Sequence, residues 1–182
     1  AGFLPNSFDV VTMWQFLEHV ATPLDYLRAA HTLLKPGGTV LVEVPNFSSL
    51  QASLARENWF HLEVPRHIFH FSPEGLTKLL EEVGFTDVRV SYTNIILVMF
   101  GFYQSFLNMA TTRKNFVFAL GNGRIGWRDL ANNKLDALVS VVATLPLLAL
   151  SGLLFLLEMA TKRSGIIRVT AQKPGARANA AH

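Results

Sequence analysis

The sequence predicts an α/β fold, and three features of its first half carry that prediction. Residues 8–13 (FDVVTM) form a short, mostly apolar run that is typical of a strand buried on both faces of a parallel sheet. An amphipathic helix follows, with Pro23 in its first turn, and the breaker cluster at residues 36–38 (PGG) ends it. Residues 39–44 (TVLVEV) then form a second β run. In such a strand–helix–strand unit, the ligand-binding crevice is expected at the carboxyl ends of the strands.

The α/β pattern continues to residue 92. A short helix is expected over residues 50–55. A second amphipathic helix begins at Ser72 and Pro73, which suit the N-cap and first helical positions, and Gly84 ends it. Residues 85–92 alternate as a strand, and residues 166–171 (IIRVTA) form a last strand.

Several stretches in this order resemble the class I S-adenosylmethionine-dependent methyltransferases, close to the ubiquinone-biosynthesis O-methyltransferase-like group. They are FDVV and LEHV within residues 8–20, LLKPGG, LVEVPN, Trp59, PRHIFHFSP at residues 65–73, and LLEEVGF at residues 79–85. The resemblance covers residues 1–92 and 166–173. It implies a Rossmann-like sheet whose last strand is antiparallel and lies between the two strands before it.

The resemblance also implies S-adenosylmethionine as the cofactor, with one departure from the family pattern. Methyltransferases of this class bind the cofactor mainly through a Gly-rich loop after the first strand and an acidic residue after the second. No such loop is found, because residues 121–123 (GNG) lie far downstream and follow no strand. We therefore expect the chain to be the C-terminal part of a methyltransferase, inactive alone, with its first strand left as an exposed edge.

Catalytic and cofactor-binding residues are expected just past the first strand. Methyl transfer needs a nucleophile near attack distance and often a base to take its proton. His19 and Glu18 lie at the expected edge and are predicted to be catalytic, although Glu18 could equally be a structural carboxylate. His67 is predicted either to act as base or orient substrate, or to bond loop backbone. By resemblance, Trp14 and Gln15 line the methionine and sulfonium side of the cofactor.

Further residues are predicted to contact substrate, and no metal site is predicted. Asn46 ends the second strand at its carboxyl edge, and Trp59, Arg66 and His70 belong to an aromatic–histidine loop that could cover the site. His67 and His70, with Glu63, hold a possible metal spacing, but the segment is short, contains a proline and lacks a further well-placed ligand.

Composition points to a membrane surface rather than nucleic acid. Only 16% of residues are charged, the net charge is +3, and the pI is about 9.5. Several Lys and Arg residues lie beside apolar segments, as expected of contact with anionic lipid, and no nucleic-acid-binding motif occurs. The absence of cysteine excludes disulfides and thiolate catalysis.

Residues 94–165 form an apolar insert between the last two predicted strands. It contains an uncharged stretch at 95–110, a basic stretch at 113–136 and an uncharged run at 138–157 that is near the length needed to span hydrocarbon. Since both flanking strands share one sheet, the insert must cross a membrane an even number of times or not at all. The basic middle favours a hairpin that dips into the cytoplasmic leaflet. The alternative is a helical hairpin that packs on the domain and covers the substrate site.

These observations predict four segments and two alternative functions. The segments are residues 1–93 (the C-terminal half of a methyltransferase domain), 94–165 (the insert), 166–173 (the last strand) and 174–182 (a disordered tail). The first function is methyl transfer to oxygen or carbon of a small or lipid-like acceptor, in the cytoplasm or on the cytoplasmic face of the membrane. The second is a membrane-associated, non-catalytic binding or scaffold protein with the same fold. Oligomeric state is not predicted.

Overall fold

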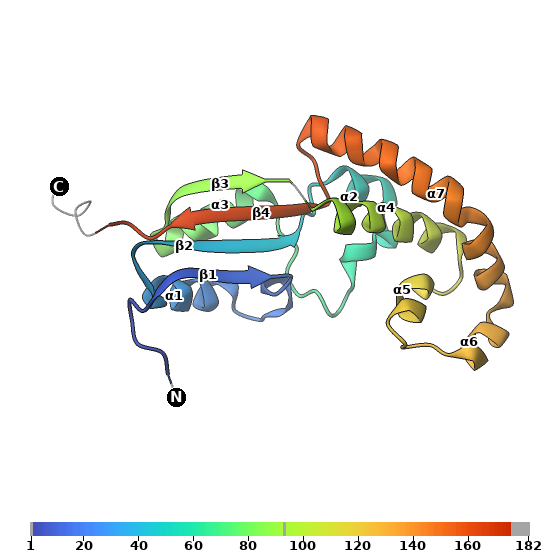
Figure 1. Ribbon diagram of the computed structural model, residues 1–182, viewed down its shortest axis with the longest axis horizontal. Helices are drawn as coiled ribbons and strands as arrows, with labels where there is room; N and C mark the ends of the chain where they lie inside the picture. Colours follow the sequence, from blue (N-terminus) through green and yellow to red (C-terminus); the bar gives the residue numbers. More distant parts are fainter. Residues whose placement is uncertain (1, 93, 176–182) are drawn as a thin grey trace. The chain divides into compact units, whose positions relative to one another are not determined.

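The computed structural model describes residues 2–92 and 94–175, which form two compact units (Figure 1). The first unit comprises residues 1–47, 64–93 and 166–182, and the second comprises residues 48–63 and 94–165. The expected tail at 174–182 lies largely outside the described residues. The second unit contains residues 48–63 together with residues 94–165.

The first unit is a mixed sheet with helices. Its elements are β1 (Phe8–Trp14), the 3-10 turn η1 (Leu17–His19), α1 (Pro23–Leu33), β2 (Leu34–Pro45), α3 (Pro73–Val83), β3 (Thr86–Ser91) and β4 (Ile166–Gln172). The strand order is β1-β2-β4-β3. β1 and β2 are parallel, and β4 is antiparallel to both of its neighbours. The predicted α/β fold with an antiparallel last strand between β2 and β3 is confirmed.

The first strand is an exposed edge of the sheet, as expected for this chain. β1 lies at the edge of the sheet, and of its seven residues only Met13 is buried. Val10 is 55% exposed. The apolar run suits a central strand, but β1 has no neighbour on its outer side among the described residues, so it stays open as an edge.

The predicted break at residues 36–38 lies inside a strand. β2 begins at Leu34, directly after α1, and runs through the PGG cluster. The pairing with β1 shifts register between Phe8 and Val10, which marks a bulge. A Cβ on Gly38 would lie 2.9 Å from the Lys35 carbonyl oxygen and 3.1 Å from that of Asp9. The glycine therefore permits close strand contact rather than a turn.

The core of the first unit lies between the sheet and two helices. α1 and α3 pack against one another, and both contact the sheet on the face that lies behind it in Figure 1. Val40, Val42 and Val44 of β2 are fully buried there with Ile167 and Val169 of β4. This alternation places the intervening residues of β2 and β4, including two charged ones, on the opposite face.

The ends of α3 agree with the sequence. The Ser72 hydroxyl accepts a hydrogen bond from the Gly75 N–H at 3.0 Å, and Pro73 occupies the first turn. Gly84 ends the helix with a φ of 100°, a conformation that glycine adopts without strain.

The second unit is helical. Its elements are α2 (Leu50–Ala55), the 3-10 turns η2 (Arg56–Asn58) and η3 (Phe60–Leu62), α4 (Ile95–Ala110), α5 (Phe116–Gly121), α6 (Trp127–Asn132) and α7 (Lys134–Thr161). α4 and α7 pack along one another (Figure 1). Among the described residues, α7 is the one helix long and apolar enough to cross a membrane.

The polarity of α7 is inverted relative to a helix of a water-soluble domain. Its buried residues are all polar: Asp136, Ser140, Ser151 and Glu158. Its exposed residues are mainly large aliphatic ones, among them Leu138, Val141, Val142, Leu145, Leu153 and Leu156, each at least 60% exposed. Only 11% of its most apolar window is buried. Water-soluble domains bury the apolar side instead.

Both acidic residues of the buried stripe are hydrogen-bonded. Asp136 accepts from the backbone N–H of Thr112 and of Arg113, at 3.0 and 2.9 Å. Glu158 accepts from the N–H of Gln51 at 3.0 Å and of Gly165 at 2.9 Å. The two carboxylates therefore tie the ends of α7 to neighbouring segments of the same unit.

The interior of α4 is also polar. The Gln104 side chain donates to Asn108 at 3.0 Å and accepts from the Phe118 N–H at 3.0 Å. Asn108 donates to Asn115 at 2.8 Å. This network holds α5 against α4, so the second unit is joined internally by hydrogen bonds rather than by an apolar core alone.

Glu158 predicts a pH dependence of stability. Burial is the main cause that raises its pKa from 4.5 to about 7. The folded protein therefore binds more protons than the unfolded chain between these values, and stability falls as the pH rises from about 4.5 to about 7. A shift of that size corresponds to a free energy of unfolding on the order of 3 kcal/mol. Urea unfolding in detergent at pH 5 and pH 8 measures the difference.

The variant Glu158→Gln should lose this pH dependence, whatever its absolute stability, because an amide does not titrate. Glu57→Gln, at an exposed position of η2 in the same unit, is the control and should keep it. Equal pH dependence of stability in the Glu158→Gln variant and the unmodified chain would show that Glu158 is not its source.

Candidate active site

The carboxyl end of β1 carries the first part of the site. Gln15 follows the strand with a φ of 46° and donates its N–H to the Glu43 carbonyl oxygen at 2.9 Å. This left-handed turn ends β1 and leads into η1. Trp14 is 49% exposed at the last position of the strand. Both predicted cofactor-binding residues thus lie at the predicted edge of the sheet.

A buried ion pair supports these two residues. The Glu43 carboxylate, 2% exposed, accepts hydrogen bonds from Arg168 Nη2 at 2.8 Å and Nε at 3.2 Å. The Gln15 side-chain amide lies 3.5 Å from the other Glu43 oxygen. The Arg168 guanidinium lies over the Trp14 ring, 4.9 Å from its centroid. Sequence reasoning missed Glu43 and Arg168, although a charged residue within each of two apolar strands is the signal that could have found them.

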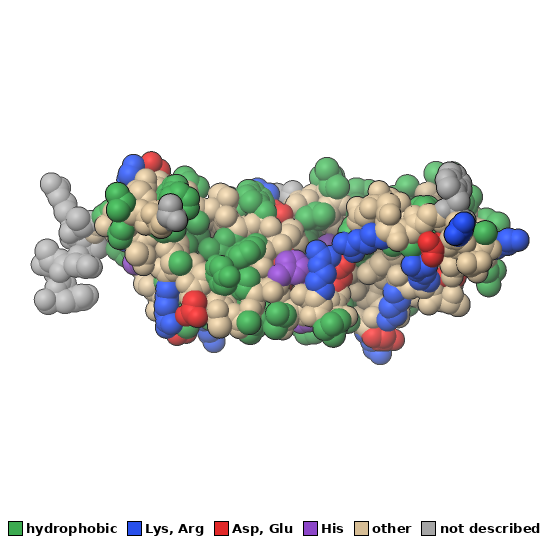
Figure 2. Space-filling view, turned by 90° about the horizontal axis from the view of Figure 1, so that it is seen from below, with side chains coloured by type: hydrophobic (Ala, Val, Ile, Leu, Met, Phe, Trp, Pro, Cys, Tyr) green, Lys and Arg blue, Asp and Glu red, His purple; other side chains and the backbone are tan. Residues whose placement is uncertain are grey.

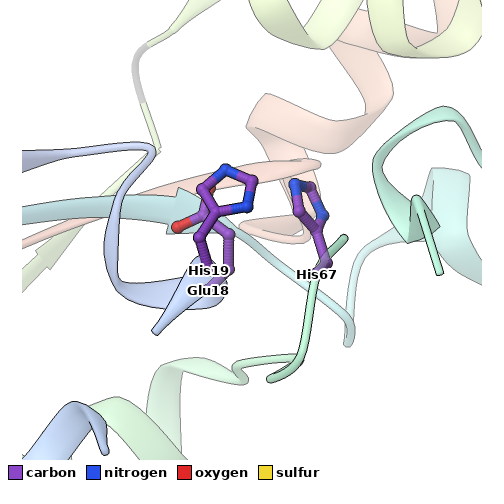
Figure 3. A group of neighbouring side chains, drawn as sticks. All are labelled: Glu18, His19 and His67. Atoms are coloured by element: carbon purple, nitrogen blue, oxygen red, sulfur yellow. The ribbon is translucent and has the colours of Figure 1, made fainter. Parts of the chain in front are cut away.

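Three predicted catalytic residues meet beside this edge (Figure 3). η1 supplies Glu18 and His19, and the loop before α3 supplies His67. The rings of His19 and His67 are in edge-to-face contact, with centroids 4.6 Å apart. Glu18 is 1% exposed and His67 is 7% exposed, whereas His19 is half-buried.

The loop that contains His67 is fixed by backbone hydrogen bonds. The N–H groups of Ile68 and Phe69 both donate to the Glu18 carbonyl oxygen, at 2.8 and 3.2 Å. At its end, Phe71 accepts from the Phe47 N–H at 2.8 Å and bridges to Asn46. The predicted residue Asn46 is therefore buried at the end of β2 and helps to join this loop to the sheet.

A hydrogen bond to the backbone sets the tautomer of His19. Nδ1–H of His19 donates to the Arg66 carbonyl oxygen at 3.2 Å. In the neutral ring, Nε2 then carries the lone pair, and it lies 3.9 Å from the Glu18 carboxylate. An imidazole held in this way can take up a proton at Nε2, and the nearby carboxylate stabilises the resulting cation.

The same atoms could hold a cation. One ligand atom each from Glu18, His19 and His67 lie within 4.8 Å of one another. Two imidazole nitrogens and a carboxylate oxygen are ligands typical of zinc and similar divalent metals. The prediction that no metal binds stays untested.

The remaining predicted residues fall in both units. The His70 ring contacts the His67 ring, with centroids 6.5 Å apart, and the Phe47 ring at 5.3 Å. Arg66 contributes its backbone carbonyl to His19, and its side chain is exposed. Trp59 belongs to the second unit, where it is 3% exposed and donates its indole N–H to Gln51 at 3.0 Å.

A family model described as a methyltransferase domain matches residues 2–90. Residues 2–90 are part of a methyltransferase domain. The matched segment contains β1, the Glu18–His19–His67 cluster and α3. The insert and β4 lie beyond it.

Curated relatives agree with this assignment. Ubiquinone biosynthesis O-methyltransferase of Xanthomonas campestris is 47% identical over 51 residues, which cover 28% of this chain and 21% of that protein. The Azotobacter vinelandii enzyme of the same name is 48% identical over 46 residues, 25% of this chain and 20% of that protein. The matches thus span about a fifth of the length of these relatives.

Solved structures share the fold. A methyltransferase from Thermotoga maritima, described as a possible histamine N-methyltransferase, has a TM-score of 0.50 at 14% identity, covering 95% of this chain and 59% of that one. A putative sarcosine dimethylglycine methyltransferase from Galdieria sulphuraria has a TM-score of 0.51 at 13% identity, covering 93% and 54%. At these identities the likeness concerns the Rossmann-like methyltransferase fold only.

The ion pair under the site predicts a loss of stability in Arg168→Met. Removing one partner of a buried pair typically costs about 3–5 kcal/mol, and the partial exposure of Arg168 reduces the expected loss of unfolding free energy to on the order of 2 kcal/mol. Denaturant unfolding measures this loss. Arg89→Met, at an exposed position of β3, is the control and should change stability by less than about 0.5 kcal/mol.

The double variant Glu43→Gln/Arg168→Met should regain part of the loss, because the buried charge is removed together with its partner. A double variant no more stable than Arg168→Met would show that the pair is not the source of the effect.

Proposed function

We propose that this chain is the acceptor-side part of an S-adenosylmethionine-dependent methyltransferase that methylates oxygen or carbon of a lipid-like acceptor. The methyltransferase-domain match and the O-methyltransferase relatives support the reaction class. The observation that carries the catalytic part is the His19 ring, which is held through Nδ1 with Nε2 available beside Glu18.

His19 is the general base in this proposal. Nε2 would take the proton from an acceptor hydroxyl or acidic C–H placed near it. The acceptor oxygen or carbon could then attack the methyl group that a bound cofactor would supply, with S-adenosylhomocysteine as the leaving group. The Glu18 carboxylate stabilises the imidazolium, and the Arg66 carbonyl keeps the ring in place. General-base catalysis of this kind contributes about 10²–10⁴-fold to the rate.

The residues at the end of β1 suit one part of the cofactor. The exposed Trp14 and the left-handed turn at Gln15 present side chains and backbone at the carboxyl edge, where the methionine side would bind. When bound, S-adenosylmethionine supplies an electrophilic methyl group. No Gly-rich loop follows a strand in the described residues, so we propose that the groups for the remainder of the cofactor lie outside this chain and that the chain alone is inactive.

The inverted polarity of α7 supports a membrane-borne acceptor. A helix that buries its polar residues and exposes aliphatic ones is suited to a hydrocarbon environment. The segment from Thr111 to Asp136 carries five Lys and Arg against two Asp. Lys and Arg side chains gather on the right-hand part of the face that Figure 2 shows. We propose that the α4–α7 hairpin enters the cytoplasmic leaflet without crossing the bilayer and that the protein works on the cytoplasmic face.

A second candidate function is that of a non-catalytic, membrane-associated binding or scaffold protein. The inverted polarity of α7 favours it as much as it favours the enzyme. A protein that kept the fold and its membrane hairpin but lost the chemistry would bind lipid without binding the cofactor. Cofactor binding therefore separates the two functions.

Calorimetric titration of S-adenosylhomocysteine tests the enzyme proposal. It is performed on this chain and on a form extended upstream. We expect binding by the extended form only. Failure of both forms to bind would favour the non-catalytic function, and binding by this chain alone would contradict the need for upstream groups.

His19→Gln in the extended form should lower kcat by about 10²–10⁴-fold, with little change in S-adenosylhomocysteine affinity, because the base is lost while the cofactor side is intact. His31→Gln, on α1, is the control, because that ring packs on Phe85 and lies in none of the site contacts described above. Loss of the activity of the unmodified extended form on addition of a chelator would contradict a metal-free base and favour a metal held by Glu18, His19 and His67.

Membrane attachment is tested by sedimentation with vesicles of phosphatidylcholine and phosphatidylglycerol. The double variant Leu145→Glu/Leu153→Glu should remain in the supernatant, since each charge on the exposed face of α7 opposes burial in hydrocarbon by about 2–3 kcal/mol. Leu4→Glu/Val64→Glu, at exposed apolar positions of the first unit, should sediment like the unmodified chain. Equal sedimentation of the two double variants would contradict attachment through α7.

A further inference from the structure

The second unit contains a cavity that no part of the proposed chemistry uses. Its volume is about 210 Å³, and it lies between α4, α5, α6 and α7. Tyr103 and Phe116, 6% and 1% exposed, line it together with Val117, Leu130 and Ala137. The described lining residues carry no charged side chain, so the cavity is suited to hydrocarbon.

The hydroxyl groups in the cavity wall are already committed to one another and to the backbone. Ser140 donates to the Asp136 carbonyl oxygen at 2.7 Å, and Thr144 donates to that of Ser140 at 2.6 Å. Since the single Thr144 proton is used in this way, the contact at 3.0 Å between Tyr103 and Thr144 has the tyrosine as donor. None of these described hydroxyls has a proton left for a ligand, which disfavours a polar occupant.

The cavity reaches the surface through residues of the apolar face. Val141, which lines it, is 74% exposed, and Leu120 is 39% exposed. A ligand would therefore enter from the side that the inverted α7 presents to hydrocarbon. The Arg124 guanidinium, three residues after the end of α5, lies 5.8 Å from the centroid of the Phe118 ring. Positive charge therefore lies beside the helix that supplies three of the lining residues.

We propose that this cavity binds the end of the hydrocarbon tail of the lipid-like methyl acceptor; this inference rests on the proposed function. A cavity of about 210 Å³ is large enough for a short piece of hydrocarbon, such as a five-carbon isoprene unit. The exposed aliphatic face of α7 can be covered by any lipid chain. A recess of limited size beside that face can hold the end of one chain.

The test uses a phenol that carries a farnesyl tail with a photoreactive diazirine at its end. The chain is irradiated with this probe in phosphatidylcholine and phosphatidylglycerol vesicles, and again in detergent micelles, and labelled peptides are mapped by mass spectrometry. We expect labelling concentrated in residues 116–120 and 137–144.

Ala137→Phe fills the cavity and should reduce this labelling by at least about tenfold. Ala149→Phe makes the same change at an exposed position of α7 outside the cavity and should leave it unchanged. Val117→Trp fills the cavity from α5 and should act like Ala137→Phe, with circular dichroism confirming that the variants stay helical.

The outcomes separate this inference from the proposed function. Labelling spread evenly along α7, or unaffected by both cavity-filling variants, overturns the tail site while vesicle sedimentation and cofactor binding stand. Equal labelling of the cavity by a diazirine-bearing phospholipid assigns it to bulk lipid and overturns the acceptor assignment. Labelling of the cavity in micelles by a chain that does not sediment with vesicles supports the cavity and overturns membrane attachment.

Discussion

The position of β4 in the middle of the sheet constrains the rest of the chain. β4 runs antiparallel between β2 and β3, and Ile166 at its start pairs with Pro45 at the end of β2. Ser91 at the end of β3 pairs with Arg168. The chain therefore leaves β3 and enters β4 at the same end of the sheet. The carboxyl ends of β1 and β2 lie at this end too. Any insert between β3 and β4 is therefore attached at the end of the sheet that carries the predicted catalytic side chains.

The same strand completes the support under the site. Arg168 is the third residue of β4, and it reaches both the buried Glu43 and the ring of Trp14. Burying an ionised carboxylate that is 2% exposed is costly, and the Arg168 guanidinium offsets that cost for Glu43. One pairing register between β2 and β4 therefore sets three features. It places β4, it positions the support under Trp14 and Gln15, and it fixes where the insert is attached.

Much of the sheet could be predicted because its signals are local. Ser72 with Pro73 and Gly84 set the ends of α3, since capping and φ preferences act within a few residues. The edge position of Glu18 and His19 could also be predicted, because strand ends in a parallel pair meet at one side. The tautomer of His19 could not, because it depends on the Arg66 carbonyl, 47 residues away.

The errors and omissions arise where tertiary contacts override local preference. The PGG cluster reads as a helix terminator, but the close approach of the Asp9 backbone makes Gly38 part of a strand. Glu43 and Arg168 are each unremarkable alone, and only the register between their strands makes them a pair.

Hydropathy alone could not decide whether α7 lies in a protein core or in lipid, and the polarity of the helix explains why. An apolar run of this length suits either a protein core or lipid, and the two differ in which side of the helix is buried. In α7 the buried stripe consists of Asp136, Ser140, Ser151 and Glu158. The side of the helix that faces the rest of the unit is therefore polar. The aliphatic side chains then have no role in the interior. An environment of low polarity outside the unit is what makes this arrangement favourable, and it connects the helix to an acceptor that lives in the same environment.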